Sequence, residues 1–150
     1  MKNCKHLLYA LSGCLTLAAF LMNGYACSNE SKSRLEHTVD SFATAYFNWR
    51  FPDAVKYCTP QSLRWLTYAS SQVTRKDVEV LRNKQEGAQC QIDDIELPDD
   101  STANILLTVN NFLSMDTIGD TPSPTAEKTF HIRAIQRQGR WMIDLDALPN

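Results

Sequence analysis

The spacing of apolar residues changes at Gly87, and this change limits the chain to a fold that combines helices with a sheet. Before Gly87, apolar side chains recur every three or four residues, as at Leu35, Val39 and Phe42, which is typical of helices buried on one face. After Gly87, apolar and polar residues alternate, which is typical of half-buried strands. The order predicts an α+β domain in which N-terminal helices pack on a mainly antiparallel, four-stranded sheet.

Local start signals predict four helical segments before Gly87. They are a capping box over 33–36 that opens a helix ending near Arg50, Asp53 as the cap of residues 54–58, Thr59-Pro60 before residues 61–72, and Thr74 with Asp77 before residues 77–85. The third helix is expected to place Leu63, Leu66 and Ser70 on one side. The fourth has an alternative, because Val78 and Val80 also suit a strand.

Turn residues divide the remainder into strands. A phase shift at Asp93-Asp94 predicts a bulged strand, and residues 98–101 predict the turn that follows it. Residues 102–113 form the most apolar predicted strand, and the polar stretch from Ser114 to Thr125 is expected to be a loop.

Gln138-Gly139 predicts a two-residue hairpin turn, which fixes how the last two strands face each other. In that register, Arg133 lies opposite Asp144 and His131 opposite Asp146 on one face, and the other face is apolar. The cross-strand pairs on that other face are Gln136 with Trp141, Ala134 with Ile143 and Ile132 with Leu145. One face is therefore expected to be buried and the other to carry charge pairs.

The stretches SFATAYFNWRFPDAVKYCTP, residues 41–60, and GRWMIDL, residues 139–145, are similar to those of small exported bacterial lipoproteins with a nuclear transport factor 2-like (cystatin-like) domain. The resemblance covers Leu35 to Leu148. It implies a curved, cone-like sheet that wraps a long N-terminal helix. Catalytic members of this superfamily use carboxylates, tyrosines or histidines inside the cone, and none of those residues is matched here.

The N-terminal residues have the order of an export signal, with Lys2 and Lys5 before an apolar stretch that ends near Met22. We expect residues 1–26 to be a signal peptide, 27–34 a lipid-anchored polar tether and 35–150 a single domain. Gly24-Tyr25-Ala26-Cys27 resembles the lipobox of bacterial lipoproteins, which implies lipidation of Cys27. Ordinary signal-peptidase cleavage after Ala26 and a retained anchor helix are the alternatives.

The chain has five cysteines, of which Cys4 and Cys14 lie in the predicted signal peptide and Cys27 at its end. Cys58 and Cys90 remain as an even pair, and an exported location predicts a disulfide between them. A buried pair of free thiols and a metal site are the alternatives. Neither cysteine has a C-x-x-C neighbour, and His37 and His131 are isolated in the sequence, so we expect no metal site.

The sequence contains no catalytic motif that assigns a reaction, and no cofactor is expected. The net charge of −2 argues against binding to nucleic acid, which requires a basic surface. His131 with Asp146 is the one acid/base couple that the hairpin brings together, and a surface charge pair is the preferred interpretation. We therefore expect a noncatalytic binding or scaffold module, anchored by lipid in the bacterial cell envelope, at the outer membrane, with an unknown envelope protein or small ligand as partner. The alternative is a small exported enzyme of the isomerase or hydrolase type that uses a pocket in the cone.

Overall fold

The computed structural model describes residues 29–114 and 121–149, and the chain divides into two units, Met1–Arg34 and Leu35–Asn150. In the first unit, residues 29–34 are described and are helical, with an exposed ion pair between Arg34 and Glu30. The predicted signal peptide, Cys27 and residues 115–120 of the predicted loop lie outside the described residues. No described helix is long and apolar enough to cross a membrane.

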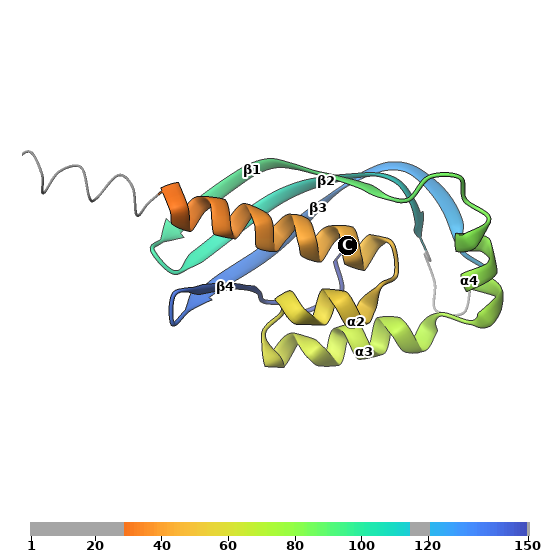
Figure 1. The fold of residues 1–150 in the computed structure, drawn as a ribbon, viewed down its shortest axis with the longest axis horizontal. Coiled ribbons are helices and arrows are strands. Elements are labelled where there is room, and N and C mark those ends of the chain that lie inside the picture. Colours follow the sequence, from red (N-terminus) through yellow and green to blue (C-terminus); the bar gives the residue numbers. More distant parts are fainter. Residues whose placement is uncertain (1–28, 115–120, 150) are drawn as a thin grey trace, which may run out of the picture. The chain divides into compact units, whose positions relative to one another are not determined.

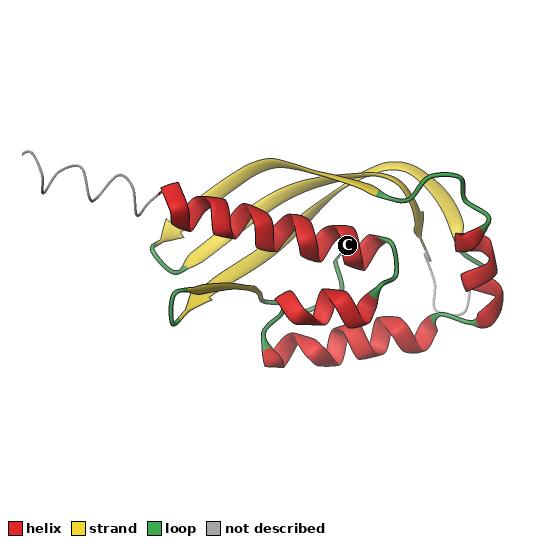
Figure 2. Cartoon of the chain, viewed as in Figure 1, coloured by secondary structure: helices red, strands yellow, loops and turns green. Residues whose placement is uncertain are grey.

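The second unit contains a four-stranded antiparallel sheet in the order β1-β2-β3-β4 (Figure 1). The strands are β1 (Gln89–Asp99), β2 (Thr102–Ser114), β3 (Ser123–Arg137) and β4 (Arg140–Ile143). The sheet is curved, and the helices lie against one of its faces (Figure 2). The predicted α+β fold with helices on a curved four-stranded sheet is therefore confirmed. The predicted loop is shorter than expected, since β3 already begins at Ser123.

The register of the sheet follows the alternation in the sequence. The register shift between Ile92 and Asp94 confirms the predicted bulge in β1. Gln138 (φ 53°) and Gly139 (φ 75°) both adopt positive φ, as a type I′ hairpin turn requires, and Gln136 pairs with Trp141 as predicted. β4 ends at Ile143, but the chain continues beside β3, because the Asp144 N–H donates to the Arg133 carbonyl at 2.9 Å.

The first helix covers residues 29–47 of the described chain, so the capping box predicted to open it at Ser33 is wrong. Residues 29–32 are already helical, and the Glu30–Arg34 pair joins positions four residues apart across the expected boundary. Glu, Lys and Arg are good helix formers, so this polar stretch extends the helix instead of ending it.

A Schellman motif ends the first helix. The Trp49 and Arg50 N–H groups donate to the carbonyls of Tyr46 and Ala45, at 2.9 and 2.8 Å, and Trp49 has a φ of 57°. The neighbouring Asn48 holds the start of β1, because its side chain exchanges two hydrogen bonds with the Ala88 backbone, at 2.8 and 3.1 Å. A Cβ at Gly87 would lie 2.5 Å from Asn48 Oδ1, so only glycine fits there without a shift.

The remaining helical elements are α2 (Phe51–Ala54), the 3₁₀ turns η1 (Val55–Tyr57) and η2 (Pro60–Ser62), α3 (Leu63–Gln72) and α4 (Arg75–Arg82). The prediction that Asp53 caps the second helix is wrong: α2 starts at Phe51, and Asp53 instead accepts a hydrogen bond from Lys56. The caps at Thr59 and at Thr74 with Asp77 are confirmed.

The core lies between the first helix and the inner face of the sheet. Phe47 from the helix contacts Phe130 and Phe112 of the sheet, with ring centroids 4.6 and 5.7 Å apart. The other fully or almost fully buried side chains include Leu35, Val39, Phe42, Leu66, Ile105, Leu107, Val109, Ile132, Trp141 and Ile143. Leu66 reaches this core from α3, but Leu63 does not, since 47% of its surface is exposed. Each large side chain buried here stabilises the fold by about 1.5–3 kcal/mol.

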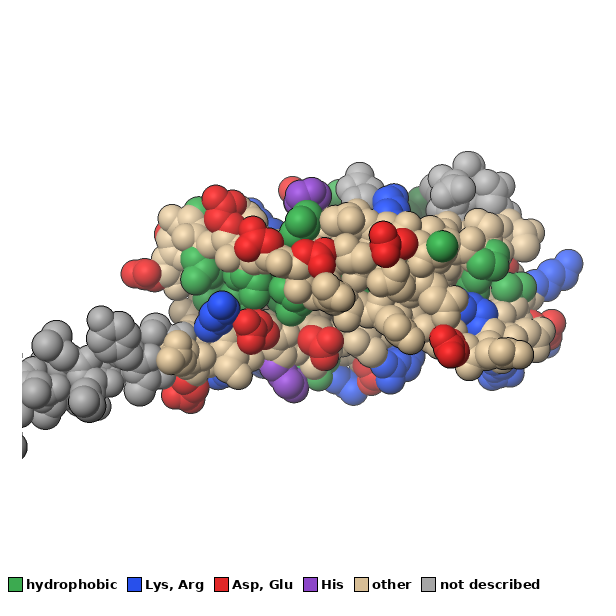
Figure 3. All heavy atoms as spheres, turned by 90° about the horizontal axis from the view of Figure 1, so that it is seen from above, with side chains coloured by type: hydrophobic (Ala, Val, Ile, Leu, Met, Phe, Trp, Pro, Cys, Tyr) green, Lys and Arg blue, Asp and Glu red, His purple; other side chains and the backbone are tan. Residues whose placement is uncertain are grey.

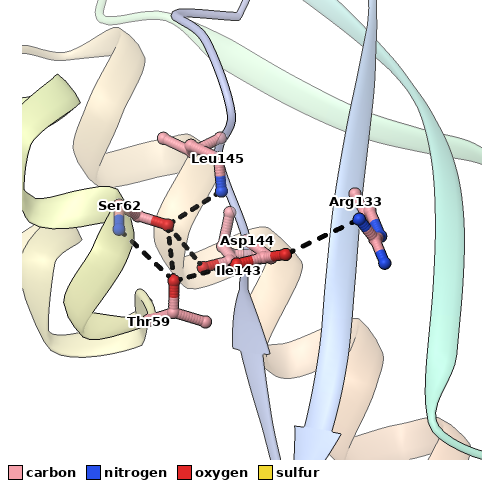
Figure 4. A network of polar contacts seen from close by, with 6 residues as sticks. All are labelled: Thr59, Ser62, Arg133, Ile143, Asp144 and Leu145. Atoms are coloured by element: carbon pink, nitrogen blue, oxygen red, sulfur yellow. Dashed lines mark hydrogen bonds and ion pairs between the residues drawn. The ribbon is translucent and has the colours of Figure 1, made fainter.

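Two buried hydroxyls join the start of α3 to the end of β4 (Figure 4). Ser62 Oγ accepts the Leu145 N–H at 2.8 Å and lies 2.7 Å from Thr59 Oγ1, which donates to Asp144 Oδ1 at 3.0 Å. The Ile143 carbonyl is also 3.2 Å from Ser62 Oγ and accepts the Thr59 N–H at 2.8 Å. The arrangement that satisfies every group is a chain in which Ser62 donates to Thr59 and Thr59 donates to the Asp144 carboxylate. We call these three residues the hydroxyl relay.

Cys58 and Cys90 are free thiols in the structure, which therefore does not contain the predicted bridge between them. Cys90 lies on β1, at one edge of the sheet, whereas Cys58 pairs with Ile143 on the outer side of β4, the opposite edge. β2, β3 and β4 thus lie between the two residues in the strand order. A disulfide requires Cα atoms closer than about 7 Å, while neighbouring strands are already about 4.8 Å apart.

We expect Ser62→Ala to lower the free energy of unfolding by about 1–3 kcal/mol, because it leaves the buried Leu145 N–H without an acceptor. The midpoint of thermal unfolding, followed by circular dichroism, should fall by roughly 3–10 °C. Ser70→Ala on the exposed side of α3 is the matched control and should change it little. Equal effects of the two substitutions would contradict the relay.

We expect both thiols to react slowly in the folded protein, because burial raises the pKa of Cys58 and of Cys90 from 9.0 to about 12. At pH 8, about one such thiol in 10,000 is ionised, compared with about one in ten after unfolding. Alkylation by iodoacetamide, mapped by peptide mass spectrometry, should therefore be slow in buffer and fast in urea. Rapid alkylation in buffer would contradict this, and resistance in urea without reductant would reveal a disulfide.

The same shifts predict a loss of stability at alkaline pH. Because the folded pKa of each thiol is raised, its contribution is fully present below pH 9 and is lost as the pH rises from about 9 towards 12. Burial also raises the pKa of Tyr46, which acts in the same direction.

Candidate functional site

The face of the sheet opposite the first helix carries polar side chains in two rows that cross the strands. In one row, Glu96 of β1 pairs with Asn104 of β2, which pairs with Arg133 of β3. In the next row, Asp94 pairs with Leu106, which pairs with His131. The residues between them, such as Ile105 and Ile132, point into the core, so strict alternation places these rows on the open face.

A groove of about 430 Å³ lies over these two rows. Its floor is formed by β1, β2 and β3, and residues 144–147 and Pro149 from the chain after β4 line it as well. The hydroxyl relay and the buried Leu145 fix where this C-terminal segment begins. The groove therefore depends on a segment that follows the last strand.

The charged side chains that line the groove are mainly acidic. Asp94, Glu96, Asp144 and Asp146 carry four negative charges, and Arg133 carries the one positive charge when His131 is neutral. Arg133 Nη1 lies 3.7 Å from Asp144 Oδ2, and 56% of the arginine side chain is exposed, so this pair contributes little to stability. Figure 3 views the molecule from above, the side on which β1 lies in Figure 1. Acidic side chains are spread along the middle of this view.

His131 and Asp146, the predicted acid/base couple, both line the groove and are both exposed. Within the described part of the chain, no hydrogen bond or ion pair joins them. The predicted pairing of Arg133 with Asp144 is present. The predicted hairpin register therefore extends from the turn as far as this pair. His131 and Asp146 thus belong to one groove without forming an assembled catalytic couple.

The space between the first helix and the sheet, where the alternative prediction of an enzyme requires a pocket, is filled mainly by apolar side chains. Phe42 and Phe47 of the first helix pack with Phe112, Phe130 and Trp141 of the sheet in one continuous core. Tyr46 is a titratable group at this location, and its ring stacks on Phe42 with centroids 5.5 Å apart. Burial raises its pKa, which keeps its hydroxyl protonated.

A smaller hollow of about 310 Å³ lies over the first helix and α2. It is lined by charged residues that neutralise one another: Lys56 Nζ is 2.7 Å from Asp53 Oδ1, and this hydrogen bond lowers the pKa of the Asp53 carboxyl. The described residues contain no group of three or more histidine, cysteine or acidic side chains that could hold a metal ion.

Sequence analysis found part of this site. The hairpin register placed Arg133 opposite Asp144, but Asp94 and Glu96 were assigned only to a bulged strand, and nothing in the sequence indicated that they share a groove with His131. The signal that could have found them is the pairing of β1 with β2 across the bulge, which brings Asp94 opposite Leu106.

Comparison with known proteins adds little to this description. No family model matches the chain, and no curated protein matches its sequence. A solved structure described as an Ntf2 like protein involved in plasmid conjugation is similar over 76% of this chain, with 11% identity and a TM-score of 0.36. The matched region spans 46% of that protein. The fold of this chain therefore rests on its own strand order and packing.

Proposed function

We propose that this protein is a noncatalytic binding module of the bacterial cell envelope, anchored by lipid at Cys27, whose open sheet face receives a cationic segment of an envelope partner. The observation that supports this best is the contrast between the two faces of the sheet. One face is closed by the core, and the other bears the groove over Asp94, Glu96, His131 and Asp146.

The chemistry of the groove favours a cationic ligand. Four carboxylates and one arginine line the groove, and the arginine is already paired with Asp144, so Asp94, Glu96 and Asp146 can accept hydrogen bonds from the lysine or arginine side chains of a ligand. Complementary charge of this kind mainly increases the rate of association and the choice of partner. Asn104 adds an amide, and Leu106 adds an apolar contact in the floor.

The alternative function, an exported isomerase or hydrolase, requires a pocket in the cone. The buried residues that fill the space between the first helix and the sheet are alanine, valine, leucine, isoleucine, phenylalanine and tryptophan, which supply no acid or base, and burial keeps the hydroxyl of the neighbouring Tyr46 protonated. His131 and Asp146 are the remaining candidates for such chemistry, and they lie on the opposite face in an exposed groove. We therefore place this alternative second.

The anchor predicts the mass of the mature N-terminus. Native protein extracted from membranes should begin at Cys27 and carry a mass increase equal to a diacylglyceryl group with an N-linked acyl chain, because more than one acyl chain is required for stable membrane binding. Intact-mass spectrometry measures this directly. An unmodified N-terminus at Cys27, or a retained residue 1–26 segment, would contradict lipidation.

The groove predicts site-specific crosslinking in cells. A photocrosslinking amino acid at Asn104, in the floor of the groove, should form a discrete adduct, and the same substitution at the exposed Glu79 of α4 is the control. Replacing both Asp94 and Asp146 with asparagine should reduce the Asn104 adduct severalfold, because it removes two charges without changing side-chain size. Equal adducts at both positions, or no effect of the double substitution, would overturn the proposed binding site.

A further inference from the structure

The chain between Asp53 and Asp77 carries positive charge alone. Residues 54–76 contain Lys56, Arg64, Arg75 and Lys76 and no acidic residue, although the whole protein has a net charge of −2. Lys56 is paired with Asp53. Arg64 on α3 and the Arg75-Lys76 pair at the start of α4 are exposed, so the basic character of this segment lies on the surface.

The same segment exposes side chains suited to a membrane interface. Leu66 and Ala69 bury one side of α3, whereas Leu63 and Tyr68 remain 47% and 36% exposed. The Arg64 guanidinium lies over the ring of the half-buried Trp65, 5.1 Å from its centroid. Tyrosine and arginine beside an aliphatic side chain concentrate where water meets lipid headgroups, and Trp65 contributes the exposed part of its ring, since its indole Nε1 is buried.

The hydroxyl groups on the exposed side of α3 are already satisfied. Ser70 Oγ donates to the Thr67 carbonyl at 2.9 Å, and Ser71 Oγ donates to the Tyr68 carbonyl at 2.7 Å. Hydroxyls that bond back to their own helix cost less free energy when water is removed from them. Removing water from this side of α3 therefore costs less free energy than it would if the serine hydroxyls had no partner in the helix.

α3 is held rigidly in the second unit, because the hydroxyl relay ties its start to β4 and Leu66 fixes its middle in the core. In Figure 1, α3 runs along one side of this unit and β1 along the opposite side, and the start of α4 continues from the end of α3. The basic helical side and the acidic strand β1 are thus separated by the core.

We propose that the α3 surface, defined by Leu63, Arg64, Trp65, Tyr68, Arg75 and Lys76, docks on an anionic phospholipid bilayer. This rests on the proposed function, since an acyl anchor would keep the domain beside such a bilayer and raise its effective concentration there. The three exposed cations of this surface complement lipid phosphates, and Asp77, which follows Lys76, is buried in the capping box at the start of α4. The exposed Leu63 and Tyr68 side chains can insert at headgroup depth, where binding increases with buried apolar area and with attraction to anionic lipids.

The test measures vesicle binding by the mature chain, residues 27–150, carrying Cys27→Ser, so that neither the apolar leader nor an acyl group contributes. Vesicles contain phosphatidylglycerol and phosphatidylcholine in equal parts, or phosphatidylcholine alone, and binding is followed by cosedimentation. The double variant Arg64→Gln/Lys76→Gln should bind the anionic vesicles roughly 25-fold more weakly, about fivefold for each cation. The matched control Lys128→Gln/Arg137→Gln removes the same charge from exposed positions on β3 and should keep the original affinity.

A second measurement distinguishes docking from general attraction. Binding to anionic vesicles should shift tryptophan emission to shorter wavelength, and Trp65→Phe should remove most of that shift, because Trp141 is buried and Trp49 lies outside the α3 surface. Equal binding to neutral and anionic vesicles, equal losses in the two double variants, or self-association through α3 in place of vesicle binding would each overturn the proposal. If vesicle binding fails but native Cys27 is acylated, the proposed docking surface is wrong and the proposed anchor is supported. If vesicle binding succeeds but native Cys27 is not acylated, the anchor is wrong and the docking surface is supported.

Discussion

The packing of the first helix into the curved sheet is the interaction on which the rest of this structure depends. Leu35, Val39, Phe42 and Phe47 lie along one side of the helix and are at most 5% exposed. They meet alternate residues of β2 and β3, so each strand is committed to one buried and one open face. Because aromatic side chains occupy the concave side, any binding surface of this unit has to use the outer face, the helices or the edges.

The elements that sequence analysis predicted correctly are those whose signals are local. Gln138-Gly139 allows positive φ at both turn positions, Thr59 precedes a proline, and Thr74 with Asp77 forms a complete capping box, so each is decided within a few residues. The switch of periodicity at Gly87 is also visible in the neighbouring residues, although the hydrogen bonds by which Asn48 holds Ala88 beside it join residues 40 positions apart. The local signals needed no knowledge of the tertiary packing.

The predictions that failed left out a competing neighbour or the order of the strands. Ser33 has the spacing of a cap, but the charged residues before it extend the helix upstream. Asp53 was expected to cap backbone N–H groups, yet Lys56 is a stronger partner for its carboxylate. The Cys58–Cys90 pairing followed from counting cysteines, and counting does not include the strand order that places the two residues at opposite edges. For the same reason the sequence indicated the Arg133–Asp144 side of the groove and missed the β1 side.

Opposite charges collect on opposite sides of the core, and this separation has a physical consequence for how the protein can associate. β1 is an edge strand with one unpaired side, and it carries Asp93, Asp94, Glu96 and Asp99, a bulge and Pro98, all of which oppose pairing with another copy of itself. Acidic residues there and cations on α3 also mean that a negatively charged bilayer attracts one side of the unit and repels the other. An anchored molecule oriented in this way would hold α3 towards the lipid and leave the acidic groove accessible, so the orientation at the membrane and the choice of a cationic ligand would arise from the same distribution of charge.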